Sequence, residues 1–435
     1  MDHPMKIRSR ASAIVMASLG SLAAPAMAAE FDARRYLSGD WNGARKSLAE
    51  TGVQLRLQYI NQTAHNVSGG DRRTTAYADQ IFAAGIFDLE ALWGWKGAEF
   101  QIEVANRNGA SVSSEAGIGA LMGPQFIYGR GTVTRLRQFS ITQRWLDDRL
   151  SLKVGRIHPG ADFFGASCTF QNLTFCNAGV SNRISDRWFG APLSALGAQV
   201  TFSPDARWFF RVGGYDANPQ NLSKEQGLRL GTSGDDNGTL LVAEVEFRPA
   251  SGSGKEGSYR LGVARNSSDL PRLVNRAGYP PGTTADAVGT HDTDRALYAS
   301  FEQQLTRNDA GGGLRLFGSV IRGDQQVTRI GEVISLGATY RAPFASRPND
   351  RIGVAIGRAS ISSELTSAQR RLALDLPDRM GAVGVQRHEI PIEVNYGIAV
   401  ARGIELMPNI QHVRHPGGRD VSSATILGLQ LNVEL

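Results

Sequence analysis

Alternation of apolar and polar residues, repeated along almost the whole chain, is the feature that most constrains the fold. In residues 53–59 every second side chain is apolar and those between are polar, and residues 426–435 show the same pattern. A period of two places all the apolar side chains on one face of a β-strand. We predict about sixteen such strands, over residues 53–59, 77–88, 99–106, 136–145, 150–156, 196–202, 208–215, 241–247, 259–265, 297–305, 314–321, 333–340, 352–358, 390–400, 404–412 and 426–435.

The length of these segments favours a membrane barrel over a soluble sheet. Strands of soluble proteins average about 5–6 residues, whereas a tilted strand that crosses a membrane needs about 9–11. Many of the alternating segments have eight or more residues, so we predict an all-β fold: a transmembrane antiparallel β-barrel of about 16 strands with a short amino-terminal helix. Aromatic residues near the segment ends are expected to form interfacial girdles, namely Tyr59, Trp145, Phe202, Trp208, Phe247, Tyr259, Tyr340 and Tyr396.

The first residues indicate export from the cytoplasm. Three basic residues, Lys6, Arg8 and Arg10, precede an uncharged stretch that ends in small residues at Ala26 and Ala28. This arrangement is typical of a secretory signal peptide. We therefore predict a signal peptide over residues 1–28, and beyond it no apolar run long enough for a membrane-spanning helix.

The rest of the chain divides into an amino-terminal segment, residues 29–51, and a barrel, residues 52–435. Asp40 is placed to cap a short helix, and Gly52 stands where a left-handed residue would end it. Such a helix is either a plug or periplasmic tether at the barrel entrance or a simple lead-in to the first strand. Both readings stay open.

Charge and cysteine content narrow the classes of function. The formal net charge is +6, and the arginines are interleaved with Asp and Glu instead of forming a basic arm, so we expect no nucleic-acid partner. Cys168 and Cys176 are the only cysteines, and in an oxidising compartment we expect them to form a disulfide. The sequence has no Gly-x-Ser-x-Gly motif, so we expect no enzyme and no cofactor. No paired His or second pair of cysteines accompanies Cys168 and Cys176, so we expect no metal site.

Four segments resemble the carbohydrate-selective porin family OprB. They are SGDWNGARKSLAETGVQLRLQY, LWGWKGAEFQIEVANRNG, RLSLKVGRIHPGADFFGASCTFQNLTFC, and IELMPNIQHVRHPGGRD with the following ATILGLQLNVEL. The resemblance covers nearly the whole mature chain and departs at Leu435, where the family usually ends on an aromatic residue.

The resemblance implies a porin in the bacterial outer membrane that lets small sugars diffuse passively into the periplasm. Such a porin would be surrounded by outer-membrane lipid and lipopolysaccharide, and the barrel-assembly machinery would insert it. A homo-oligomer is possible. Two alternatives remain: a general or anion-preferring porin, and a secreted all-β sugar-binding protein.

The candidate solute-binding residues lie on one long loop and on the polar faces of the strands. We expect residues 157–195 to fold into the pore, with the loop's Arg and Asp side chains opposing each other across a constriction and Trp188 offering a ring face. Arginine donates to hydroxyl oxygens, carboxylates accept from hydroxyl hydrogens, and an aromatic face covers the apolar side of a sugar ring. The candidates are Arg56, Asp162, Arg183, Asp186, Arg187, Trp188, Arg211, Glu244, Arg260 and Arg315.

Overall fold

The computed structural model describes residues 35–128, 131–165, 168–176, 185, 187–231, 238–249, 256–381 and 384–435. The predicted signal peptide, and with it residues 29–34 of the amino-terminal segment, lies outside the described residues, as do Arg183 and Asp186.

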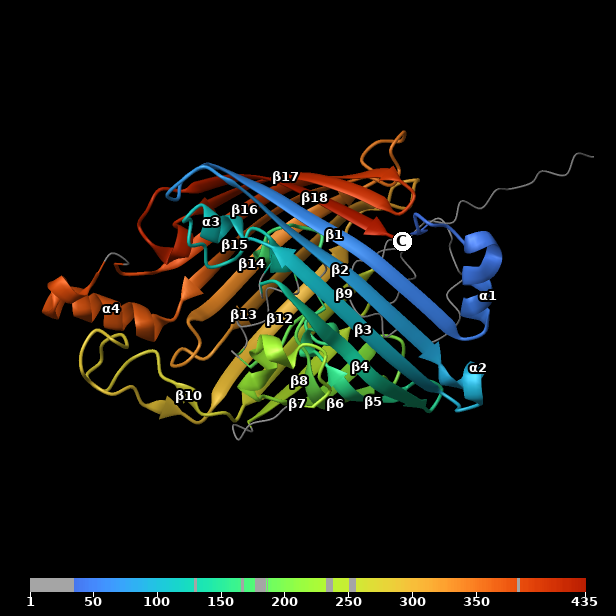
Figure 1. The fold of residues 1–435 in the computed structure, drawn as a ribbon, viewed down its shortest axis with the longest axis horizontal. Helices are drawn as coiled ribbons and strands as arrows, with labels where there is room; N and C mark the ends of the chain where they lie inside the picture. The colour runs from blue at the N-terminus through green and yellow to red at the C-terminus, as the bar shows by residue number, and fades with distance from the viewer. Residues whose placement is uncertain are drawn as a thin grey trace, which may run out of the picture.

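In the described part of the chain, sixteen antiparallel strands form one closed barrel, as predicted (Figure 1). Each strand pairs with its neighbours along the chain, and β1 pairs with β18 to close the barrel. The strands are β1 (Val53–Ser68), β2 (Thr75–Asp88), β3 (Ala98–Gly109), β4 (Val133–Trp145), β5 (Leu150–Ile157), β6 (Ala195–Phe202), β7 (Trp208–Asp216), β8 (Thr239–Phe247), β9 (Gly257–Asn266), β12 (Asp294–Gln304), β13 (Gly313–Arg322), β14 (Ile330–Arg341), β15 (Arg351–Ile361), β16 (His388–Ala401), β17 (Ile404–Arg414) and β18 (Ala424–Glu434). A separate two-stranded sheet joins β10 (Leu270–Pro271) to β11 (Thr290–His291).

The alternation of residues decides which side chains face outward. On β15, Val354 and Ile356 are exposed on the outer surface, while Ala355 and Gly357, which alternate with them, are buried toward the lumen. The other strands repeat this arrangement, so the barrel has an apolar exterior and a lumen lined largely by polar and small residues. Among the described residues no helix is long and apolar enough to cross a membrane.

The two ends of the barrel differ in the length of their connections. Every connection at the end where β1 begins and β18 finishes is short, and all the long loops lie at the other end. Bacterial barrels have short periplasmic turns and long extracellular loops, which assigns the two ends. Figure 1 shows α1 (Ala44–Glu50) and α2 (Leu89–Trp93) at the periplasmic end, and α4 (Ser363–Asp375) with β10 at the extracellular end.

Helix α1 lies where the barrel strands start and finish. Gly43, and not Asp40, is the N-cap residue of this helix. Asp40 lies three residues earlier, and its carboxylate accepts a hydrogen bond from the backbone N–H of Lys46 at 2.9 Å. Gly52 has the expected left-handed conformation, with φ +92°. Arg45 donates to the carbonyl oxygen of Leu435 at 2.7 Å, which ties the helix to the end of β18.

The predicted aromatic girdle is present at one rim only. Of the eight aromatic residues named above, seven lie at or toward the periplasmic ends of their strands. The exception is Tyr59 in the middle of β1, whose hydroxyl is hydrogen-bonded to that of Tyr77. The extracellular ends carry other residues, described below.

Two extracellular loops fold into the barrel. The second loop, residues 110–132, contains α3 (Val112–Glu115) and η3 (Phe126–Tyr128). The third loop, residues 158–194, contains η4 (Pro159–Ala161) and η5 (Leu173–Phe175). The remaining single-turn helices are η2 (Trp41–Gly43), η7 (Pro219–Leu222), η8 (Lys224–Gln226), η10 (Pro377–Arg379) and η11 (Pro416–Gly418).

Candidate solute-binding constriction

The third loop enters the lumen, and its apolar residues near the beginning of the loop pack against the barrel wall. Phe163 and Phe164 are buried there, each edge-on to a tyrosine of the wall, Tyr215 on β7 and Tyr298 on β12 respectively. Trp188 joins this cluster, with 0% of its surface exposed. The expectation that Trp188 offers a ring to solute is therefore wrong, because neighbouring aromatic residues cover it.

Polar contacts fix this end of the loop to the wall. The backbone N–H of Phe164 donates to Glu244 on β8 at 2.6 Å, and its carbonyl accepts from Ser300 on β12 at 2.7 Å. Asp162 pairs with Lys153 of β5 at 2.8 Å. Asp162 thus faces a lysine of the wall, which corrects the expectation that it would oppose an arginine of its own loop.

A second anchor holds the far part of the loop. Gln171 and Asn172 donate their backbone N–H groups to the carboxylate of Glu393 on β16, at 2.9 and 2.7 Å. Asn172 also donates through its side chain to Gln411 on β17 at 3.0 Å. Because β8 and β16 lie in different walls, the third loop crosses the lumen between its two anchors.

The Cys168–Cys176 disulfide, which we predicted, closes the part of the loop that includes this second anchor. The loop lies against β15, where lumen-facing residues are small. A Cβ added to Gly357 would collide with Thr174, and one added to Gly353 would press on Phe170. The row of small residues on β15 therefore provides the space in which the loop docks.

Charged side chains form a compact cluster on the lumenal face of β7, β8 and β9. Arg211 contacts Glu244 at 3.1 Å and Glu246 at 2.7 Å, while Arg260 contacts the same two carboxylates at 3.4 and 3.2 Å. Arg248 adds a third guanidinium at 2.7 Å from Glu246. The structure thus brings together Arg211, Glu244 and Arg260, three of the residues that we named from the sequence.

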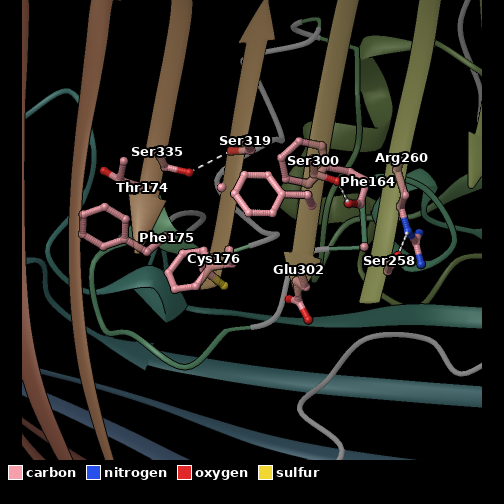
Figure 2. A pocket seen from close by; sticks show the side chains of 14 residues that line it. Phe164, Thr174, Phe175, Cys176, Ser258, Arg260, Ser300, Glu302, Ser319 and Ser335 are labelled. Carbon is pink, nitrogen blue, oxygen red and sulfur yellow. Dashed lines mark hydrogen bonds between the residues drawn. The ribbon is translucent and has the colours of Figure 1, made fainter. Parts of the chain in front are cut away.

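A hollow lies beside this cluster, between the third loop and the wall of β9, β12, β13 and β14 (Figure 2). Serine hydroxyls from four strands line it, together with the guanidinium of Arg260 and the carboxylate of Glu302. The rings of Phe175 from the loop and Phe317 from β13 supply apolar faces. The four serines are Ser258, Ser300, Ser319 and Ser335.

The other predicted residues lie apart from the hollow or at its edge. Arg315, on the lumenal face of β13, contacts Glu302 at 3.4 Å. Arg56 is on the lumenal face of β1, seven strands from β8 around the barrel and therefore in the opposite wall. Arg187 is partly buried beside Trp188 in the third loop.

Sequence reasoning missed the second loop and most of the hollow. Leu121 and Met122 donate their backbone N–H groups to Glu389 on β16, at 2.7 and 3.0 Å, so this loop also docks inside the barrel. The long interval between the predicted strands at 99–106 and 136–145 was the available signal for it. Phe317 and the serines carried no such signal, because alternation predicts which side of the wall they face and not what stands opposite.

Comparisons with known proteins agree with this geometry. A family model described as "Carbohydrate-selective porin, OprB family" matches residues 72–435. "Porin B" of Pseudomonas aeruginosa is 33% identical over 415 residues, which cover 91% of this chain and 90% of that protein. "Putative porin QuiX" of Acinetobacter baylyi is 28% identical over 424 residues, covering 92% and 93% of the two chains. The high-pH structure of Pseudomonas putida OprB superposes with a TM-score of 0.87 at 29% identity, over 92% of this chain and 98% of that one.

Proposed function

We propose, on the premise that the chain belongs to the carbohydrate-selective porin family OprB, that it selects its solute at the hollow beneath the third loop. As a member of this family the chain is an outer-membrane porin for the passive diffusion of small sugars. The observation that carries the proposal is the combination of an aromatic face, that of Phe317, with four hydroxyl groups and one charge of each sign in the same hollow.

This combination suits a neutral polyol. The partly exposed ring of Phe317 is placed to cover the apolar face of a pyranose, while the serine hydroxyls both donate and accept hydrogen bonds. Arg260 donates to hydroxyl oxygens and Glu302 accepts from hydroxyl hydrogens. Passive transport requires weak contacts, because a tight site would not release its solute.

Pairing of charges argues against an anion-preferring pore. In the lumenal cluster, Arg211 and Arg260 each contact both Glu244 and Glu246. With Arg248 the cluster holds three guanidiniums and two carboxylates, so most of its positive charge is balanced within the wall and only a weak field is left to attract a free anion. A general or anion-preferring porin remains the second candidate, and the reversal potential in a salt gradient separates the two.

Phe317→Ala tests the proposed site. Loss of the ring should weaken the block of ion current by glucose about three- to tenfold in planar bilayers, the effect of losing an aromatic contact worth about 0.5–1.5 kcal/mol. Phe210→Ala is the matched control, because Phe210 is 45% exposed on the outer surface of β7. Heat-modifiable migration on gels shows that both variants fold. Glucose block equal to wild type in Phe317→Ala would place selection elsewhere in the barrel.

Several finer features belong to this proposal. Residues 1–28 direct export and are removed, and residues 29–51 precede the barrel as a separate segment. The barrel-assembly machinery inserts the chain, and lipopolysaccharide surrounds its outer half. We propose no catalytic activity, and self-association into a homo-oligomer is left open.

A further inference from the structure

Five arginines lie on the outer surface of the barrel near the extracellular ends of their strands. They occupy outward positions on β9, β12, β13, β15 and β17, within the last few residues of each strand at that end. All five are exposed. We refer to this set as the arginine belt: Arg265, Arg295, Arg322, Arg358 and Arg414.

Within the part of the chain that the structure describes, no side chain pairs with these guanidiniums. Arg265 stands directly opposite Arg295 in the β9–β12 register, an arrangement of like charges that destabilises a sheet. One carboxylate shares this outward face, that of Glu332, which is opposite Arg322 in the β13–β14 register. Glu332 makes no ion pair with Arg322 among the described residues. The belt therefore carries a net positive charge that no carboxylate of the described residues pairs with.

The height of the belt matches the headgroup region of the outer leaflet. Immediately below it on the same strands, Val263, Leu297, Val320 and Ile356 are exposed as part of the apolar band. No Phe, Tyr or Trp takes the outward position at the extracellular ends of the described strands β9 and β12 to β17. The guanidiniums occupy the level at which a second aromatic girdle was expected.

The opposite wall lacks this feature. Outward polar groups on β1 to β4 pair with one another: Asn106 donates to Thr134 at 2.7 Å, and Asn108 donates to Asp79 at 3.2 Å. The outward strand positions of β1 to β4 hold no arginine or lysine. The need for an external anion is thus confined to the side of the barrel from β9 to β17.

We propose that the arginine belt binds the phosphate groups of lipopolysaccharide in the outer leaflet. Guanidiniums recognise phosphate with two parallel hydrogen bonds, and a phosphate between Arg265 and Arg295 converts their repulsion into two attractive contacts. The inference rests on the outer-membrane location of the chain and does not depend on where sugar is selected.

The test compares two double variants of the full-length folded barrel in detergent. Arg265→Gln with Arg295→Gln removes the opposed pair of the belt. Arg307→Gln with Arg402→Gln removes the same charge from exposed periplasmic turns. Affinity is measured for purified lipopolysaccharide and for the same lipopolysaccharide after enzymatic removal of its phosphates. Heat-modifiable migration establishes folding, and glucose block serves as a check on the pore.

We expect the belt variant to bind intact lipopolysaccharide about tenfold or more weakly than wild type, from roughly 1 kcal/mol per arginine near a charged membrane surface. The periplasmic control should stay within about twofold of wild type, and wild type should bind the dephosphorylated lipid as weakly as the belt variant binds the intact one. Equal weakening in both double variants would mean a general charge effect and overturn the proposal. Unchanged affinity in the belt variant, or tight wild-type binding of the dephosphorylated lipid, would overturn it as well. Glucose block should be the same in every variant.

Discussion

Replacing Glu393 with glutamine should release the third loop from its second anchor. Glu393 is fully buried, and its two carboxylate oxygens accept separate backbone N–H groups, from Gln171 at 2.9 Å and from Asn172 at 2.7 Å. Glutamine has nearly the same shape, but one of its two terminal atoms is a donor. Whichever way the amide is turned, one backbone N–H of the loop then faces another N–H.

The size of the effect follows from these contacts. A buried donor left without an acceptor costs about 1–3 kcal/mol. The middle of that range, about 2 kcal/mol, corresponds to a shift of about 30-fold in the equilibrium between docked and released loop. The anchor at Glu244 and the Cys168–Cys176 disulfide are not altered, so the barrel itself should still fold.

Hydrogen exchange of the peptide spanning residues 168–176 measures the release directly. Protection of this peptide should fall by about the same factor in Glu393→Gln, and glucose block of the ion current should weaken with it. Glu99→Gln is the control, because Glu99 is a partly buried lumenal carboxylate that pairs with Arg144 at 3.2 Å. Wild-type protection in Glu393→Gln, equal to that of the control, would refute the view that this carboxylate holds the loop.

Two further predictions concern assembly and pH. Leu429 is 42% exposed on the outer face in the middle of β18, so Leu429→Arg should cost about 2–4 kcal/mol and reduce folding into lipid vesicles, whereas Leu429→Ile should fold normally. Burial alone would raise the pKa of Asp350, in the periplasmic turn before β15, but hydrogen bonds from Arg347, Tyr396 and a backbone amide lower it below the usual value. Its contribution to stability is therefore present above about pH 4 and lost as the pH falls through the native pKa. Asp350→Asn should lower the unfolding temperature at about pH 7 and have a smaller effect at about pH 2, and an equal effect at both would contradict the assignment.

The sequence by itself determined the wall of the barrel. All sixteen predicted segments are strands of the closed barrel, because alternation is a local property: a residue faces lipid or lumen according to its parity along the strand. Strand lengths were underestimated at several ends. β1 continues to Ser68, beyond the predicted 53–59, because Ile60, Asn61 and the polar residues that follow interrupt the alternation while the hydrogen-bond ladder with β2 continues.

Parity also placed several lumenal charges correctly. Arg211, Glu244 and Arg260 were expected on the inner face, and the structure brings them into one cluster. Their pairing follows from register, since Arg211 is directly opposite Glu244. The disulfide was predictable too, because an exported chain with two cysteines close in sequence has few other ways to use them.

Only the tertiary structure decided what the loops do inside the barrel. A loop has no periodic pattern, so its sequence does not show which of its side chains meet a distant wall. Trp188 was expected to face solute and is buried, because Phe163 and Tyr298 reach it from a different part of the loop and from β12. The hollow arises in the same way: Phe175 and Phe317 both line it although 142 residues separate them, a proximity that closure of the barrel creates.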